Sequence, residues 1–256
     1  MLKKWLQISF LNLAIVALLG VVMRYKILYP LPFVDQKKFL HAHSHFAFSG
    51  WVTLALMSLL ISKLGNDNNA IFRKYRPVLI ANLLTAYGML LSFPFEGYGL
   101  ISIIFSTLSI FVSYWFAIQY RRDLNRLGEK KVSSLWFKAA VLFNVISSAG
   151  AFTLAGIMAT RSTHTGIYLA AVYFFLHFQY NGWFFFACMG LLTHKLEQYA
   201  VKKEQLLIIY RLFVYACVPA YMLSVLWVKL PVWLYMLVIV AVVLQLTGWI
   251  ITVKHI

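Results

Sequence analysis

Charge is scarce in this sequence, and acidic residues are the scarcest charged type. Only 12% of the 256 residues are charged and only 7 are Asp or Glu, whereas 62% are hydrophobic. A water-soluble fold is excluded, because its surface needs far more polar side chains than this chain supplies. The 23 Lys and Arg residues lie in short groups between long apolar runs and form no continuous cationic face. Nucleic-acid binding is therefore not expected, and the net positive charge belongs to loops.

Cysteine is almost absent as well. Cys188 and Cys217 lie within apolar runs and lack the CxxC or Cys/His spacing of zinc and iron–sulfur sites. The first apolar run extends from Trp5 to Val22, and no small-residue cleavage site follows it. We therefore expect this run to be a retained helix and not a signal peptide.

Long apolar runs predict helices that cross a membrane, since each crossing needs about 20 apolar residues. The predicted helices are 5–23, 40–62, 77–95, 99–120, 134–160, 165–193, 205–227 and 231–253. Pro77 and Pro231 are expected in first helical turns, and Pro94 with Gly97 and Gly99 in a tight reversal. No long linker, repeat or low-complexity stretch is expected. The predicted fold is all-α: one polytopic membrane helix bundle of about eight transmembrane helices, covering residues 1–256.

The distribution of basic residues predicts the topology. With eight crossings, 17 of the 23 basic residues fall on the side of the N-terminus. The other six are Arg24, Lys26, Lys37, Lys38, Arg161 and Lys229. Positive charge accumulates in cytoplasmic loops, so both termini are predicted to be cytoplasmic. The expected location is the bacterial inner (cytoplasmic) membrane, where the lipid bilayer surrounds a multi-pass protein.

Three histidines open the second predicted helix. Helical geometry puts His41, His45 and Ser49 on one face, and His43 and Gly50 on the opposite side. Neutral imidazole is the commonest metal ligand, and glycine allows close approach of a flat macrocycle or a helix. Interfacial histidines that reach water are the alternative. Alternate histidines that run into a helix favour ligands, since only the outermost reaches water easily.

A second polar group lies in the middle of the sixth predicted helix. Tyr173, His177, Tyr180 and Asn181 follow the spacing of one helical face and are predicted to form a stripe toward the bundle interior. His177 falls close to the bilayer midplane. For this residue, metal ligation and an interhelical hydrogen-bond cluster both stay open.

These two segments resemble a known family. His43–Trp51 resembles the second-helix motif of the haem–copper oxidase superfamily and its small relatives, including NnrS-type haem–copper membrane proteins. His177–Trp183 is similar to the sixth-helix motif of the nitric oxide reductase branch, with Asn181 at the place of a glutamate. The resemblance implies a b-type haem, with copper or iron as the other candidates. It gives His45, His43 and His177 as cofactor-binding residues. Together with the helical faces described above, the expected metal ligands are His41, His45 and His177, with Tyr173, Tyr180, Asn181 and Gly50 around them.

Several parts of the family pattern are missing from this chain. Full oxidases and reductases are longer and carry further histidines after the sixth helix, whereas only His194 and His255 follow His177 here. A complete binuclear site is therefore not expected from this chain alone. The implied function is respiratory electron transfer, or the handling or sensing of oxygen or nitric oxide. A partner subunit or electron carrier and a diatomic gas are the implied partners.

Whether the chain is an enzyme stays open; if it is one, the resemblance implies a haem-dependent oxidoreductase. Two other classes of function also stay open. One is a metal-free membrane scaffold or assembly factor. The other is a small permease whose polar stripe binds substrate at the midplane.

Overall fold

A computed structural model describes residues 1–65, 67–128, 131–160, 163–199 and 201–255. Within these ranges every regular element is a helix. Seven helices in the described part are long and apolar enough to cross a membrane. The all-helical, multi-pass class of membrane protein is thus confirmed, while eight crossings and cytoplasmic termini stay predictions. Lys130 and Arg161, two basic residues used for the topology, lie outside the described ranges.

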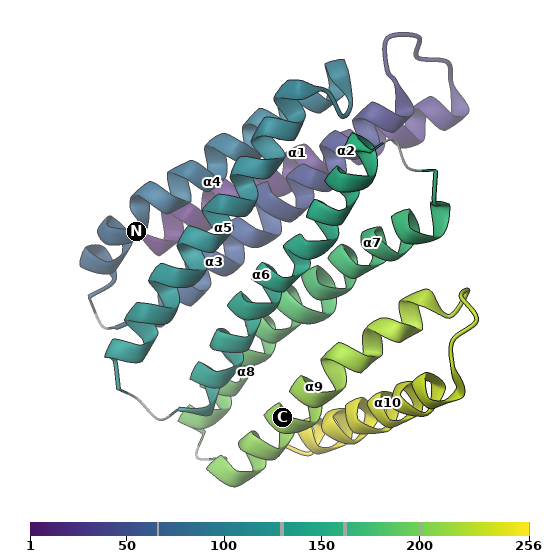
Figure 1. Ribbon diagram of the computed structural model, residues 1–256. Helices are drawn as coiled ribbons and strands as arrows, with labels where there is room; N and C mark the ends of the chain where they lie inside the picture. Colours follow the sequence, from purple (N-terminus) through teal and green to yellow (C-terminus); the bar gives the residue numbers. More distant parts are fainter. Residues whose placement is uncertain (66, 129–130, 161–162, 200, 256) are drawn as a thin grey trace. The chain divides into compact units, whose positions relative to one another are not determined.

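The chain forms two compact units, Met1–Leu127 and Gly128–Ile256. In the described part of unit 1, the helices form four rods, each a straight run of consecutive helical residues (Figure 1). The elements are α1 (Leu2–Leu28), α2 (Gln36–Phe46), η1 (Ala47–Thr53), α3 (Leu54–Ile61), α4 (Asn68–Glu96) and α5 (Leu100–Arg126). The second rod consists of α2, η1 and α3 without interruption. It packs on both α1 and α4, for example where Phe46 contacts Val16 and Ala86.

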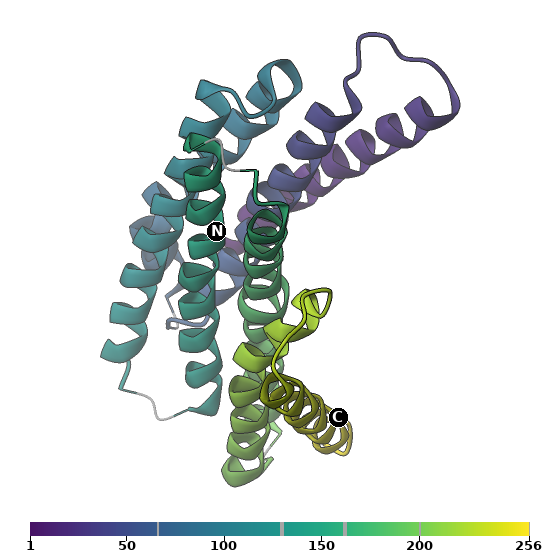
Figure 2. The ribbon, with the colours of Figure 1, turned by 45° about the vertical axis from the view of Figure 1, so that its right-hand side comes forward.

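Unit 2 also has four rods over its described residues. The elements are α6 (Val132–Ala159), α7 (Thr165–His177), η2 (Phe178–Phe184), α8 (Phe185–Gln198), α9 (Lys203–Ala220), η3 (Tyr221–Val225) and α10 (Val232–Val253). The rod from Thr165 to Gln198 is not among the seven membrane-crossing candidates. Its central His177, Gln179 and Asn181 lower its hydropathy. In both views α10 lies beside α9, where small alanine side chains pack together (Figure 1 and Figure 2).

Helix ends differ from the predictions where a capping residue, and not hydropathy, determines where the helix begins. The side chain of Asp67 accepts hydrogen bonds from the backbone of Asn69 and Ala70, so α4 begins well before its apolar run. Pro77 consequently lies inside α4, and its expected place in a first turn is wrong. Pro231 does lie at the start of a helix, as the N-cap of α10.

The predicted reversal is found at Gly97 and Gly99, but Pro94 lies inside α4 and not in the reversal. Gly97 ends α4 with a φ of 64°, a left-handed conformation that suits glycine, and Gly99 is the N-cap of α5. Large apolar side chains such as Phe10, Leu84 and Phe111 are exposed on the rods of unit 1, at 54% or more. Such surfaces are compatible with contact to a lipid bilayer.

Candidate functional site

Both histidine motifs run directly into π-helical turns. In unit 1, η1 begins two residues after His45, and in unit 2, η2 begins immediately after His177. π-helical turns are rare and occur often at functional sites. Ordinary helical periodicity in the sequence does not predict these turns.

His41 and His45 share one face of α2, as their spacing predicted. The His45 ring stacks on Phe93 with ring centroids 4.6 Å apart, and the His41 ring meets the ring of Tyr98 at 4.5 Å. The Nε2 atom of His45 lies 3.2 Å from the Tyr98 hydroxyl. Phe93 comes from the end of α4 and Tyr98 from the turn before α5. Two imidazoles and one phenol therefore meet at this end of unit 1.

One nitrogen in this group is left unpaired. The Nε2 atom of His41 is buried and has no hydrogen-bond partner in the part of the chain that the structure describes. Leaving a buried polar atom without a partner costs about 1–3 kcal/mol, so each case needs an explanation. A ligand that binds the imidazole would satisfy this atom.

His43 points the other way. Its Nδ1 atom lies 3.1 Å from the carbonyl oxygen of Val16 in α1, and its ring packs beside Gly20. The resemblance gave His43 as the companion of His45, but the structure does not bring His43 into the group with His41 and Tyr98. Gly50 faces the same helix, since its carbonyl bonds a side chain of α1.

Side chains from neighbouring helices hold the π-helical turn of unit 1. The bonds run from Asn82 Nδ2 to Ser49 O (3.0 Å), from Asn12 Nδ2 to Gly50 O (2.6 Å) and from Ser9 Oγ to Trp51 O (3.0 Å). Asn12 is fully buried, and its Oδ1 accepts from the Tyr87 hydroxyl at 2.6 Å. Sequence reasoning missed these residues, although a polar side chain inside an apolar run is itself a signal. They fix the helix directly after the histidines.

In unit 2, His177 is buried and both of its ring nitrogens are occupied. Nε2 lies 2.8 Å from the carbonyl oxygen of Cys217, and Nδ1 lies 3.2 Å from the side-chain nitrogen of Asn181. A carbonyl only accepts, so Nε2 carries the hydrogen and Nδ1 accepts from the Asn181 amide. His177 would have to give up one of these bonds to ligate a metal. The result is a hydrogen-bond cluster in which the Cys217 bond joins two rods and the Asn181 bond lies within one.

The predicted polar stripe does not stay on one buried face. His177 is 5% exposed, but Tyr173 and Tyr180 are 39% and 53% exposed. A π-helical turn contains more residues than an α-helical turn, so the periodicity that placed Tyr180 beside His177 fails. For Tyr173, one α-helical turn before His177, the structure offers no comparable reason. Gln179 is buried instead, and its Nε2 donates to Asn144 Oδ1 at 2.9 Å and to Ser147 Oγ at 2.7 Å.

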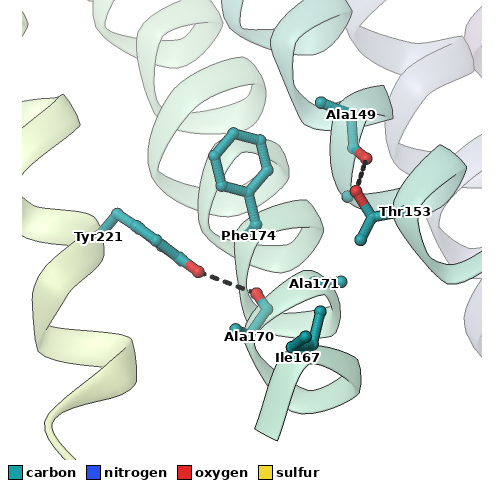
Figure 3. Close-up of a pocket in the computed structure, with 8 residues that line it drawn as sticks. Ala149, Thr153, Ile167, Ala170, Ala171, Phe174 and Tyr221 are labelled. Carbon is teal, nitrogen blue, oxygen red and sulfur yellow. Dashed lines mark hydrogen bonds between the residues drawn. The ribbon is translucent and has the colours of Figure 1, made fainter. Parts of the chain in front are cut away.

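Unit 2 also contains an apolar pocket of about 220 Å³ (Figure 3). Its wall consists of Ala149, Gly150, Thr153, Ile167, Ala170, Ala171, Phe174 and Tyr221. The two hydroxyl groups in the wall already donate to backbone carbonyls, Tyr221 to Ala170 at 2.9 Å and Thr153 to Ala149 at 2.8 Å. The Tyr221 ring also contacts His177, with centroids 5.8 Å apart. The pocket is thus an apolar space that borders the hydrogen-bond cluster.

His41 and His45 bring two imidazoles together in unit 1. In the described ranges no three His, Cys, Asp or Glu side chains come together in a way that would hold a metal ion. Haem supplies four ligands from its ring and needs only an axial imidazole from the protein. His41 and His45 fit that requirement better than they fit a bare ion, which needs a cage of protein ligands.

Comparisons with protein-family models, with curated proteins and with solved structures give no match for this chain.

Proposed function

We propose that this membrane protein binds a b-type haem through the His41 and His45 face of α2. The observation that carries the proposal is the buried Nε2 atom of His41, which has no partner among the described residues and lies on the same face as His45. When bound, the haem would supply the chemistry of electron transfer, or of the handling of oxygen or nitric oxide.

Within this proposal His45 is the axial ligand and His41 is its alternate. His45 holds the position that the family motif gives to the haem histidine. Its ring is already oriented by the stack on Phe93 and by the Tyr98 hydroxyl, 3.2 Å from Nε2, so Nδ1 is the nitrogen that would bind iron. Ligands whose orientation is fixed by neighbours bind metals more tightly. Copper or iron held by the same imidazoles would be the other outcome of the test below.

The bonds around η1 support this assignment. Asn12 and Asn82 bind consecutive carbonyls of the π-helical turn, immediately after the histidines. A site placed on a rigid element is held in position better than a site on a loop. The proposal therefore treats these asparagines as supports for the orientation of His45.

The test is an absorption spectrum of the detergent-purified chain, combined with haem and metal analysis. Alanine is placed in turn at His41, His45, His43 and His177. We expect a Soret band in the wild type and its loss or strong weakening in His45→Ala. His43→Ala is the matched control, because His43 lies on the same helix but bonds α1. A wild type without haem, copper or iron, even after haem is supplied, would contradict the proposal.

A metal-free scaffold is the second candidate function, and one observation favours it. The Nε2 atom of His177 donates to the backbone oxygen of Cys217 in α9, and the buried side chain of Gln179 donates to Asn144 in α6, so both bonds join neighbouring helices. Interhelical bonds of this kind hold membrane bundles together, at about 0.6 kcal/mol each on average. A colourless protein in which only His177→Ala loses thermal stability would favour the scaffold over the haem protein.

A further inference from the structure

The two units carry the same residues at the same place in their second rods. Residues 45–64 and 177–196 align without a gap, and 10 of these 20 positions are identical. Counted in unit 1, with partners 132 positions later, they are His45, Phe46, Gly50, Trp51, Ala55, Met57, Leu59, Leu60, Lys63 and Leu64. The π-helical turns also correspond to within one residue. The expectation that the sequence holds no repeat is wrong.

The neighbouring helices also hydrogen-bond the second rod at corresponding places, although through different atoms. Asn12 in α1 and Asn144 in α6 are also 132 positions apart, and each binds the second rod of its own unit. In unit 1 the third rod donates from Asn82 to the carbonyl of Ser49. In unit 2 the third rod donates from Cys217 Sγ to the carbonyl of Asn181, at 3.6 Å. Ser49 and Asn181 are the residues directly before the shared Gly-Trp pair.

We infer that the chain is a tandem duplication of one four-rod module. We also infer that His45 in the first module can bind a ligand, whereas hydrogen bonds to the ring of His177 close the corresponding ligand position in the second module. The second half of this inference rests on the proposed function. The first half depends only on the repeated sequence and contacts.

Two corresponding positions account for the difference between the modules. One turn before the shared histidine, unit 1 has His41 and unit 2 has Tyr173. One turn after it, the Ser49 hydroxyl donates to the backbone oxygen of His45 at 2.7 Å and leaves the ring alone. The Asn181 amide instead reaches the ring of His177 at 3.2 Å. In both modules Nε2 already has a partner, the Tyr98 hydroxyl for His45 and the Cys217 carbonyl for His177. The two positions therefore decide whether Nδ1 is available, and we expect one haem per chain.

The state of His177 can be measured without any ligand. In the full-length protein labelled with ¹⁵N-histidine, the His177 signal is assigned by its loss in His177→Asn. We expect the tautomer with hydrogen on Nε2, unchanged when haem is added, whereas the His45 signal shifts or broadens. A His177 signal of the other tautomer, or one that haem shifts as strongly as that of His45, would overturn the closure. If the wild type binds no haem, the proposed function fails. The tautomer of His177 still shows in that case whether its ring is hydrogen-bonded.

The closed position can also be opened. The double variant Tyr173→His, Asn181→Ser gives unit 2 the residues of unit 1 at both positions. We expect the haem content to rise from one toward two per chain, and Tyr180→Phe, next to Asn181 on the exposed side, is the matched control. Suppose that the double variant folds and that the ¹⁵N signal shows that the Nδ1 atom of His177 has lost its hydrogen bond. If it then still binds only one haem, the assignment of these two positions is overturned.

An exchange of segments tests the duplication itself. In one variant residues 55–64 take the sequence of 187–196, which changes only Leu56→Cys, Ser58→Gly, Ile61→Thr and Ser62→His. In a second variant residues 187–196 take the sequence of 55–64. We expect both to insert into membranes and to purify as monodisperse protein, because each segment enters an equivalent environment. A control with the segment shifted by one residue should aggregate. Aggregation of both exchange variants to the extent of the control would overturn the duplication.

Discussion

The side-chain amide of Asn12 donates a 2.6 Å hydrogen bond to the backbone carbonyl of Gly50, which lies inside the π-helical turn of the second rod. Asn12 is fully buried, and its oxygen also accepts from the Tyr87 hydroxyl. One side chain thus joins α1, η1 and α4. In the apolar interior of a membrane protein, water does not replace such bonds.

Replacing Asn12 by alanine is expected to lower the free energy of unfolding by about 1–2 kcal/mol, because it leaves a buried carbonyl and a hydroxyl without their partners. The measurement is unfolding by SDS in detergent micelles. Gln7→Ala, at an exposed position of the same helix, is the control. Equal unfolding midpoints for the two variants would show that the Asn12 bonds do not stabilise unit 1.

We expect a glycine-to-alanine substitution to have opposite effects on stability at Gly182 and at Gly156. A Cβ at Gly182 would lie 2.6 Å from the Cβ of Phe143, whereas a Cβ at Gly156 would meet nothing within 4 Å. Gly182→Ala should therefore destabilise unit 2 by about 1–3 kcal/mol through overpacking. Gly156→Ala, on an exposed part of α6, should be neutral or stabilise by up to about 1 kcal/mol. Thermal unfolding measures both, and a stable Gly182→Ala protein would contradict the close approach of α6 to η2.

Glu197 caps a helix that is distant in sequence. Its carboxylate accepts from the backbone of Val132 at 2.7 Å and Ser133 at 3.1 Å, and from the Ser133 hydroxyl at 2.6 Å. Glu197→Ala is expected to destabilise unit 2 by about 1–2 kcal/mol, since the first turn of α6 loses its acceptor. Glu197→Gln should recover part of this loss. Gln198→Ala, at the exposed neighbouring residue, should change little in the same thermal unfolding experiment.

Asp35 predicts a dependence on pH at the start of α2. A hydrogen bond from the backbone N–H of Lys38 lowers the pKa of this carboxyl below its ordinary value of 3.8. The unfolded chain then binds the proton more readily, so the stabilisation is present above pH 3.8 and is lost as the pH falls through the lowered value. The difference in Tm between wild type and Asp35→Ala should thus vanish in strong acid. Asp35→Asn can still cap the helix but does not titrate. If the difference in Tm between Asp35→Asn and Asp35→Ala vanished in the same pH range, titration of the Asp35 carboxyl would not be the cause.

Much of the fold could be predicted because the apolar runs that cross a membrane are also the cores of the helices. The fourth predicted helix shows the limit of this reasoning: the apolar run covers 99–120, whereas the helix α5 continues to Arg126. Helical hydrogen bonds do not require an apolar environment, so a helix extends past the bilayer into charged sequence. Hydropathy therefore locates a crossing better than it locates the end of a helix.

The arrangement of the candidate site could be predicted where it depends on one helix, but not where it depends on several. The shared face of His41 and His45 follows from α-helical geometry alone. Phe93 and Tyr98 reach that face from another part of the chain, and no local pattern announces such a contact. The repeat was different, because Gly50-Trp51 and Gly182-Trp183 were visible in the sequence. A comparison of the two halves at a spacing of 132 residues would have found it.

The π-helical turn makes the direction of the histidines sensitive to chain length. Each residue of an α-helix turns the chain by about 100°, and a π-helical turn contains additional residues. Deleting one residue between Ala47 and Thr53, so that the rod relaxes to an ordinary α-helix, would swing His41 and His45 around the axis by about that angle relative to α3. They would then leave Phe93 and Tyr98 although neither histidine had changed. This segment should therefore tolerate no single-residue insertion or deletion.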